Sequence, residues 1–198
     1  MKRQKILNEK SPNFIGCWHL ENHSICDEII DFFEKNKDLQ QQGSTSRGVE
    51  IDRKKTTDIT INPKDLNNIS HKMFKDYFEN LQECYLDYKE QWPFLKTFLD
   101  KINIGYFNVQ KYLPGDHFSA LHSERTHIST IHRVFAFMTY LNDVKDGGTT
   151  DFEFYGLKIK PEKGKTLIWP SEWTHAHTGS VLKGGSKYII TGWLYFPV

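Results

Sequence analysis

The sequence predicts an α+β fold: a jelly roll, or double-stranded β-helix, with helices from the first half of the chain packed on one face. Two observations lead to this prediction. Apolar residues recur at helical spacing before Pro93, whereas short β-branched and aromatic segments follow it. Many short strands with regular turns are typical of two packed sheets. The length of 198 residues fits a single domain with a sizeable core.

The chain begins with a predicted strand over residues 13–20 and a helix after it. Ser24 is a suitable N-cap, and the apolar residues that follow predict a helix that ends near Gly43. Residues 40–53 are polar and are interpreted as a loop. Together with the basic run that follows, this loop, residues 40–57, is a candidate for a flexible lid.

A second helix is predicted from Asn62 onwards. Asn62 is a good cap, and Pro63 suits the first helical position because its missing N–H has no helical partner there. Apolar residues then recur at helical spacing to about Glu90.

The second half of the chain is rich in predicted strands. Pairs of Gly with Pro, Asp, Lys or Gly mark turns between them. The predicted strands are 104–112, 133–141, 157–159, 166–169 and 187–196.

The composition excludes some classes of function. There are 26 basic and 25 acidic residues, a net charge of +1, which argues against nucleic acid as a partner. No apolar run approaches the ~20 residues needed to span a bilayer, and residues 1–10 do not form a secretory signal. The three cysteines are odd in number and lack metal-type spacing. We therefore expect a cytoplasmic protein without membrane contact.

The most informative segment is His122-Ser123-Glu124. On a strand, residues two apart project from the same face, so His122 and Glu124 would lie together. A later histidine, His177, would complete a set of two imidazoles and one carboxylate, which leaves one side of a metal open as in non-heme Fe(II) oxygenases. With nine histidines in the chain, the short motif can also arise by chance on an exposed strand.

Lys187 follows His177 by ten positions. Near the metal it would offer a fixed cation to the far carboxylate of a dicarboxylic acid. The alternative is a solvated strand lysine. Lys187 precedes an apolar run, however, and a buried lysine needs an anionic partner.

Further motifs surround these residues in a consistent order. Tyr112 precedes a Pro-Gly turn, and a Trp lies six positions after Lys187. The ordered elements are Tyr112, His122-x-Glu124, Tyr140-Leu141-Asn142, Gly147-Gly148-Thr149-Thr150-Asp151-Phe152, His177, Lys187 and Trp193. In this order and spacing, residues 100–198 resemble the 2-oxoglutarate- and Fe(II)-dependent dioxygenases of the prolyl 4-hydroxylase type.

This resemblance implies a function and a division of the chain. The metal ligands would be His122, Glu124 and His177, and the cofactors Fe(II) and 2-oxoglutarate, with ascorbate as a reductant. Lys187 would bind the far carboxylate of 2-oxoglutarate, and the other implied contacts are Tyr112, Thr150 and Trp193. Residues 1–198 would form one dioxygenase domain, with 1–99 as helix-rich support and lid and 100–198 as the metal-binding core.

Two positions depart from or compete with the family pattern. The usual carboxylate ligand is Asp, and Glu124 is one methylene longer. His175 competes with His177, but only His177 has the family's ten-residue spacing to Lys187, which leaves His175 to orient a ligand or line the mouth. Arg133 would anchor a substrate carboxylate or pair with an acid, and the sequence does not separate these roles.

The predicted function is hydroxylation of a C–H bond, with a prolyl or other residue of a peptide or protein, or a small molecule, as substrate, and release of succinate and CO₂. The alternative is a cupin-like metal-binding protein that is non-catalytic or hydrolytic, with Zn²⁺ as its metal. The sequence identifies neither the substrate nor the oligomeric state.

Overall fold

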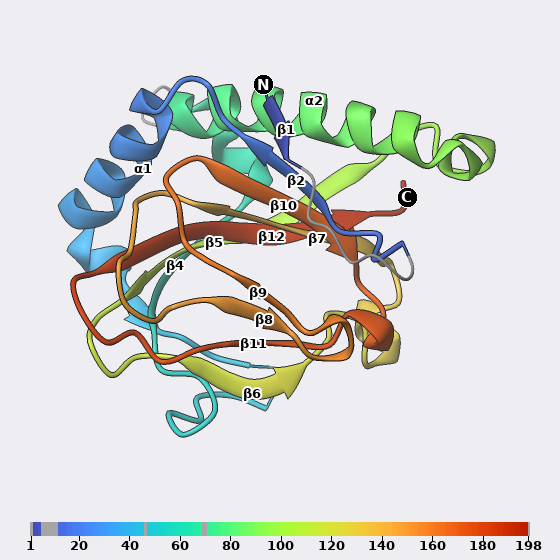
Figure 1. Ribbon diagram of the computed structural model, residues 1–198. Helices are drawn as coiled ribbons and strands as arrows, with labels where there is room; N and C mark the ends of the chain where they lie inside the picture. Colours follow the sequence, from blue (N-terminus) through green and yellow to red (C-terminus); the bar gives the residue numbers. More distant parts are fainter. Residues whose placement is uncertain (1, 5–11, 46, 69–70, 198) are drawn as a thin grey trace.

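The structure, a computed structural model, describes residues 2–4, 12–45, 47–68 and 71–197. These residues fold into two stacked antiparallel sheets, with helices across the outer face of the larger sheet (Figure 1). The larger sheet contains, in spatial order, β1 (Lys2–Gln4), β2 (Gly16–His19), β10 (Lys165–Pro170), β7 (Arg133–Tyr140), β12 (Lys187–Tyr195), β5 (Asn103–Tyr112), β4 (Thr57–Ile61) and β3 (Gln41–Gln42). The smaller sheet contains β6 (Phe118–His122), β11 (His177–Gly179), β8 (Thr150–Phe152) and β9 (Leu157–Ile159). This architecture confirms the predicted α+β jelly roll.

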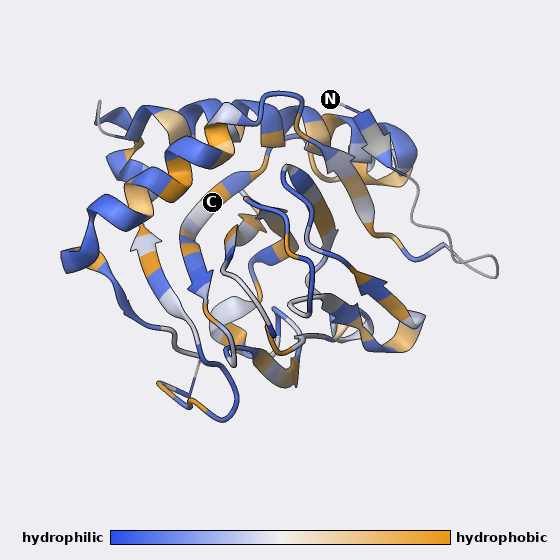
Figure 2. Cartoon of the chain, turned by 60° about the vertical axis from the view of Figure 1, so that its left-hand side comes forward, coloured by the Kyte–Doolittle hydropathy of each residue, from blue (hydrophilic) through white to orange (hydrophobic). Residues whose placement is uncertain are grey.

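Helices α1 (Ser24–Lys35) and α2 (Lys72–Gln91) pack against each other and cover the larger sheet. Their apolar faces turn toward the sheet, as the colouring in Figure 2 shows. The buried residues of α2 are Phe74, Tyr77, Phe78, Leu81, Cys84, Tyr85 and Tyr88. The predicted packing of the helices on one face is thus confirmed. Within the described ranges, no helix is long and apolar enough to cross a membrane.

The start and end of α1 differ from the prediction. Ser24 is the first helical residue, not the cap, and the side chain of Asn22 accepts a hydrogen bond from its backbone N–H at 3.0 Å. The helix ends at Lys35, well before Gly43. At its end, the amide of Asn36 donates to the carbonyl of Phe32 at 2.7 Å, and such side-chain bonds compete with continuation of the helix.

The second predicted helix is divided into two parts. Asn62 does act as a cap, because its side chain accepts from the N–H of Lys64 at 3.1 Å. It caps a short 3₁₀ turn, Pro63–Asn67, and Asn68 is extended. Two consecutive asparagines have low helix propensity, so the long helix begins only at Lys72.

Strand alternation builds two separate cores on the two faces of the larger sheet. In β7, Phe135 and Phe137 point toward the helices, whereas Ala136, Met138 and Tyr140 point between the sheets. The inner core continues with residues from both sheets and from the segments beside them: Ile15, Cys17, Tyr112, Phe152, Ile159, Leu167, Trp169, Leu182 and Ile189. The space between the sheets is therefore filled by side chains and holds the functional residues at one end.

The candidate lid is tied to the edges of both sheets. Gln41–Gln42 forms strand β3, although the sequence predicts a loop over residues 40–53. The backbone of Lys55 exchanges two hydrogen bonds with His117, at 2.8 and 3.1 Å. A third bond runs from the N–H of Ala120 to the carbonyl of Arg53. These bonds hold the segment against β6, and its movement as a lid stays a prediction.

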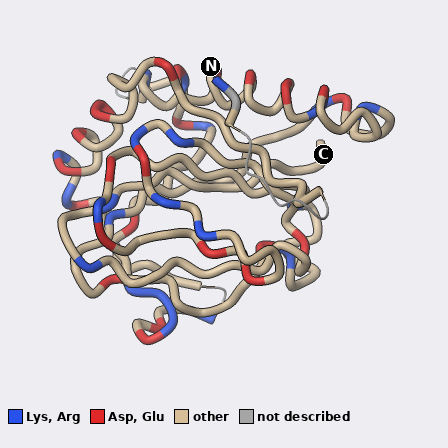
Figure 3. The backbone as a smooth tube through the Cα atoms, in the orientation of Figure 1, with Lys and Arg blue, Asp and Glu red and all other residues tan. Residues whose placement is uncertain are grey.

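Charged residues of both signs are mixed over the molecule (Figure 3). This mixing agrees with the net charge of +1. In the part of the chain that Figure 3 describes, acidic and basic residues are therefore not separated into two regions.

Candidate metal centre

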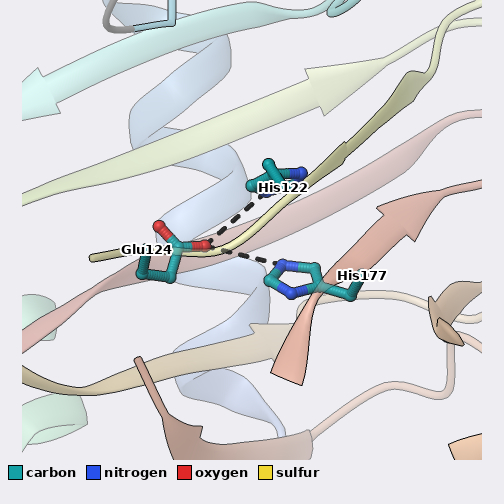
Figure 4. Close-up of side chains that lie close together, drawn as sticks. All are labelled: His122, Glu124 and His177. Carbon is teal, nitrogen blue, oxygen red and sulfur yellow. Dashed lines mark ion pairs between the residues drawn. The ribbon is translucent and has the colours of Figure 1, made fainter. Parts of the chain in front are cut away.

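The three predicted metal ligands converge at one end of the smaller sheet (Figure 4). His122 is the last residue of β6 and lies directly opposite His177, the first residue of β11. Directly opposed residues on paired strands have neighbouring side chains, and the two ring centroids are 4.4 Å apart. Glu124 lies two residues beyond the end of β6. The expectation that His122 and Glu124 share a strand face is therefore wrong, and a bend at Glu124 returns its carboxylate to the imidazoles.

A single carboxylate oxygen faces both imidazoles. Oε1 of Glu124 lies 3.6 Å from Nε2 of His122 and 3.5 Å from Nε2 of His177. The ligand atoms of the three side chains all lie within 4.8 Å of one another. Separations of this size allow the three atoms to share one metal ion.

The hydrogen bonds of the two histidines fix which nitrogen faces the carboxylate. Nδ1 of His122 lies 2.8 Å from the carbonyl of Ala120, and Nδ1 of His177 lies 2.9 Å from the carbonyl of His175. A carbonyl only accepts, so in the neutral rings Nδ1 carries the proton and Nε2 presents a lone pair. Two lone pairs and a carboxylate then converge without a donor between them. A bound cation resolves this repulsion, so the donor set fits a divalent metal such as Fe(II).

Aromatic side chains surround the imidazoles. Phe118 stacks on His122 at 3.8 Å between ring centroids. Phe152 and Trp169 lie 5.3 and 5.2 Å from the ring of His177. Burial, together with the neighbouring His122, lowers the pKa of His177 to about 4. The ring is therefore neutral at physiological pH, the form that binds a metal.

The second oxygen of Glu124 is held by other side chains. The indole Nε1 of Trp193 donates to Oε2 at 2.7 Å, and the guanidinium of Arg133 stacks on the Trp193 ring at 3.5 Å. Arg133 also donates to the backbone carbonyl of Glu124 at 3.0 Å. Burial raises the pKa of Glu124, but His122, His177, the Trp193 bond and Arg133 together lower it below its usual value. The carboxylate is therefore ionised.

Lys187 lies inside the fold without an anionic partner among the described residues. It is 2% exposed, and Nζ donates to the carbonyl of Gly148 at 3.0 Å. Nζ also lies 3.9 Å from the centre of the Tyr112 ring, which faces Lys187 across the β5–β12 pair. Burial lowers the pKa of Lys187 to about 7. A buried ammonium in this position favours binding of an anion.

A chain of polar contacts ends at the hydroxyl of Tyr112. The buried pair Lys54–Asp58 has its charged atoms 2.7 Å apart. Asp58 accepts from the amide of Gln110 at 3.1 Å, so the Gln110 oxygen faces Tyr112 and accepts from its hydroxyl at 2.9 Å. Burial, with the nearby Asp58, raises the pKa of Tyr112 well above its usual value. The hydroxyl proton thus bonds to Gln110, and the donation to 2-oxoglutarate implied by the resemblance stays a prediction.

Two implied co-substrate contacts remain, Trp193 and Thr150. Trp193 donates to Glu124, and its contact with 2-oxoglutarate stays a prediction. Thr150 is the second of the two. Its hydroxyl lies 2.6 Å from the hydroxyl of Tyr140, and the residue is buried in β8. Thr150 follows Gly148, whose carbonyl binds Lys187, by two positions. Its contact with 2-oxoglutarate also stays a prediction.

His175 orients a predicted ligand without joining the cluster. Its backbone carbonyl accepts from Nδ1 of His177, whereas its own Nε2 lies 2.9 Å from the carbonyl of Asn13. Three further histidines serve local structure. His117 pairs with Lys55, His127 caps a 3₁₀ turn, and His132 packs edge-on against Tyr195.

Sequence reasoning missed the polar side chains behind the site. Nothing in the sequence links Trp193 to Glu124 or Lys54 to Asp58. A weak signal exists for Gln110 and Tyr112, which are two apart in a predicted strand and therefore share a face.

Comparisons with known proteins agree with this geometry. Residues 107–195 match the family model of the 2OG-Fe(II) oxygenase superfamily. Probable prolyl 4-hydroxylase 9 of Arabidopsis thaliana is 26% identical over 135 residues, 55% of this chain and 47% of the relative. Prolyl 4-hydroxylase 13 of the same plant is 27% identical over 51% of this chain and 44% of its own length. The chain thus spans about half the length of these curated relatives.

Solved structures share the fold. The viral collagen prolyl hydroxylase of Paramecium bursaria Chlorella virus-1, in complex with 2OG, has a TM-score of 0.68 and 19% identity over 93% of this chain and 97% of its own. A Pseudomonas putida prolyl-4-hydroxylase has a TM-score of 0.70 and 15% identity over 94% of both chains. A Trichoplax adhaerens prolyl hydroxylase, in complex with a hypoxia inducible factor peptide fragment, has a TM-score of 0.70 and 17% identity over 92% of this chain and 84% of its own.

The jelly roll carries a His-Glu-His cluster that could hold a metal ion. Residues 107–195 are thus similar to the 2OG-Fe(II) oxygenase superfamily, and part of the chain is similar to prolyl 4-hydroxylases. The family implies Fe(II) and 2-oxoglutarate as cofactors.

Proposed function

We propose that this protein is a 2-oxoglutarate- and Fe(II)-dependent dioxygenase that hydroxylates a C–H bond in a residue of a peptide or protein. The overall reaction converts substrate, 2-oxoglutarate and O₂ to hydroxylated substrate, succinate and CO₂. When bound, the metal supplies the oxidising chemistry, and the protein supplies binding and orientation.

One observation carries the proposal: two neutral imidazoles and one carboxylate oxygen converge, while a buried lysine in the same fold has no anionic partner among the described residues. His122, Glu124 and His177 would hold the metal from one side. Lys187 would pair with the far carboxylate of 2-oxoglutarate, and the aromatic ring of Tyr112 would exclude water from that contact. A hydrolytic or non-catalytic metal site has no use for this buried cation.

The substrate class rests on the relatives. A structural relative was solved with a peptide fragment, and the curated relatives are named prolyl 4-hydroxylases. Peptidyl proline is therefore the first substrate to test. We also propose a cytoplasmic location, because the three cysteines are buried, free thiols and fit a reducing compartment.

The decisive experiment is calorimetric titration of 2-oxoglutarate into anaerobic, Mn(II)-loaded protein. We expect binding that requires the metal and is lost in His177→Ala and Lys187→Ala. The control is Lys183→Ala, since the Lys183 side chain is 67% exposed and should not affect binding. Binding that persists in Lys187→Ala would contradict the assigned role of this lysine.

A second assay addresses catalysis. Protein with Fe(II), 2-oxoglutarate and O₂ is incubated with proline-containing peptides, and succinate and a 16 Da mass increase per added oxygen atom are measured. Absence of 2-oxoglutarate binding, together with metal-dependent hydrolysis, would favour the hydrolytic alternative.

A further inference from the structure

The carboxylate of Glu124 is contacted on its outer side by Trp193 and Arg133. Oε1 of Glu124 faces the two histidines, and Oε2 accepts the indole N–H of Trp193 at 2.7 Å. An indole N–H only donates, so it holds a carboxylate oxygen and cannot act as a ligand itself. Oε1 is therefore directed at the proposed metal position, whereas Oε2 accepts the hydrogen bond that holds the carboxylate.

Arg133 holds the indole in place. Its guanidinium lies 3.5 Å from the centre of the Trp193 ring, and the same group donates to the backbone carbonyl of Glu124 at 3.0 Å. Stacking of a guanidinium on an indole is among the stronger cation–π contacts. Arg133 thus contacts both the indole of Trp193, which binds the side chain of Glu124, and the backbone carbonyl of Glu124 itself.

The strand that carries Trp193 is irregular at this position. The pairing of β12 with β5 shifts register between Gly192 and Leu194, so Trp193 lies in a bulge. A bulge changes the direction in which a side chain points, and bulges are frequent beside active sites. A Cβ on Gly192 would lie 2.8 Å from the ring of Phe137, so this close packing requires glycine. The backbone is therefore shaped locally to direct the indole.

Glutamate creates a need for such contacts. It has one more rotatable bond than aspartate and loses more freedom when it is ordered. With both oxygens free, a carboxylate can also bind a metal through two atoms and take an extra coordination position. A donor on Oε2 keeps that oxygen away from the metal, and leaves the open side that the proposed chemistry requires.

We propose that Trp193 is a positioning residue for the metal-binding carboxylate, that Arg133 holds its indole in place, and that this pair fits the site to glutamate rather than aspartate. The inference rests on the proposed function. It has an unexpected consequence: aspartate, the usual residue of the family, should bind metal worse here. Its shorter side chain cannot reach both the indole and the point between the histidines.

The test is a double-mutant cycle on Mn(II) affinity, measured without 2-oxoglutarate by electron paramagnetic resonance of free Mn(II). The variants are Trp193→Phe, Glu124→Asp and the double variant. We expect Trp193→Phe to weaken Mn(II) binding about tenfold, since a charge-assisted bond of this kind is lost. Glu124→Asp should weaken it at least as much, and the double variant should match Glu124→Asp alone, because the bond is already absent.

Two further measurements separate positioning from general damage. Trp173→Phe removes an indole that is 67% exposed and should leave Mn(II) affinity unchanged. In the Co(II)-loaded protein, Trp193→Phe should change the visible absorption bands, which report coordination number, and Trp173→Phe should not. Arg133→Met should weaken Mn(II) binding by less than Trp193→Phe, because the direct bond remains.

The outcomes are distinguishable. If the wild-type protein binds no Mn(II), the proposed function itself fails. If the wild type binds Mn(II) and Glu124→Asp binds equally or more tightly, or the two substitutions are additive, the positioning role of Trp193 is wrong. The Glu124→Asp result decides the matter even where Trp193→Phe does not fold.

Discussion

Among single residues, Lys187 has an environment that disfavours its charge. It is 2% exposed, and its ammonium contacts the carbonyl of Gly148 and the face of Tyr112. Burial lowers its pKa to about 7. Burying the ammonium of Lys187 therefore carries a desolvation cost that pairing with a dicarboxylate would offset.

This environment predicts how stability depends on pH. An unfolded lysine has a pKa of about 10.4, so above pH 7 the unfolded chain binds more protons at this position than the folded one. The free energy of unfolding should then rise with pH, by at most about 1.4 kcal/mol per unit for one proton. We expect wild type to gain stability from pH 7 to 8 relative to Lys187→Met, in urea unfolding without ligand. Equal slopes for the two proteins would show that Lys187 remains protonated.

The pH window for this comparison has an upper limit. Burial raises the pKa of the Cys17 thiol to about 12 and that of Cys26 to about 11. The unfolded thiols lose their protons near pH 8.5, so these residues reduce the stability of the fold above that pH. The difference between wild type and Lys187→Met cancels this common contribution.

The Lys54–Asp58 ion pair is a second residue-level feature with a sharp consequence. Its side chains are 5% and 9% exposed, and Asp58 also binds Gln110. Asp58→Asn leaves a buried ammonium without its partner and should cost about 3–5 kcal/mol in the free energy of unfolding. The double variant Lys54→Met/Asp58→Asn should cost clearly less, because both charges are removed.

An exposed pair of the same spacing provides the control. Lys72 and Asp76 are also four residues apart. Nζ of Lys72 lies 2.6 Å from Oδ2 of Asp76, and the Lys72 side chain is 74% exposed. Asp76→Asn should therefore leave the urea midpoint nearly unchanged. A loss for Asp76→Asn as large as that for Asp58→Asn would argue against burial as the cause.

At the level of elements, strand β12 connects the two parts of the site. Lys187 begins the strand and Trp193 lies near its end, so one strand carries both the predicted co-substrate cation and the contact to Glu124. The turn before β8 supplies the carbonyl that binds Lys187. Gly147 and Gly148 in this turn have φ of 77° and 68°, which glycine adopts without strain.

This turn predicts an effect of a single methyl group. In Gly148→Ala, the new Cβ would lie 3.2 Å from Cδ of Lys187 and 3.2 Å from Cδ1 of Leu182, at a left-handed φ. We expect a loss of about 1–2 kcal/mol in unfolding free energy and weaker 2-oxoglutarate binding, because Lys187 is displaced. Calorimetry and urea unfolding measure the two effects.

Gly184 is the matched control for this substitution. A Cβ at Gly184 meets nothing within 4 Å. Gly184→Ala should therefore bind 2-oxoglutarate like wild type. If Gly148→Ala also binds normally, the turn does not set the position of Lys187.

For the whole molecule, both hydrophobic cores contain residues from the first half of the chain, so this half is an integral part of the fold. Strands β1 to β4 extend the larger sheet, and α2 covers Phe107, Phe135 and Phe137 with its own aromatic residues. Without this layer, one whole apolar face of the sheet would meet water.

A fragment of residues 100–198 should therefore not fold alone, although it contains every predicted ligand. We expect a poorly dispersed amide NMR spectrum and no cooperative thermal transition for the fragment, in contrast to the full chain. A well-dispersed spectrum that responds to Mn(II) would show that the core is independent of the helices.

Five of the eight strands that the structure describes in the second half were predictable because their pattern is local, whereas β6, β8 and β11 of the smaller sheet were not among the predicted strands. Short segments separated by turn signals were predicted as strands, among them 157–159, and β9 (Leu157–Ile159) confirms this one. The helix ends were less predictable. Asn36 and Asn68 end helical segments through their own backbone angles and bonds, and a count of apolar spacing does not register them.

The sequence by itself determined the fold class, because periodicity is a property of the chain, and its motif order predicted the ligand types, which stay a prediction. The ten-residue spacing to Lys187 also favoured His177 over His175, and His177 is the one that lies with His122 and Glu124. Only the tertiary structure decided that His122 and His177 are cross-strand partners, that Arg133 stacks on Trp193, and that Trp193 holds the outer oxygen of Glu124. The physical reason is that these contacts join residues up to 69 positions apart, whose meeting depends on strand register and on a bulge that no local pattern encodes.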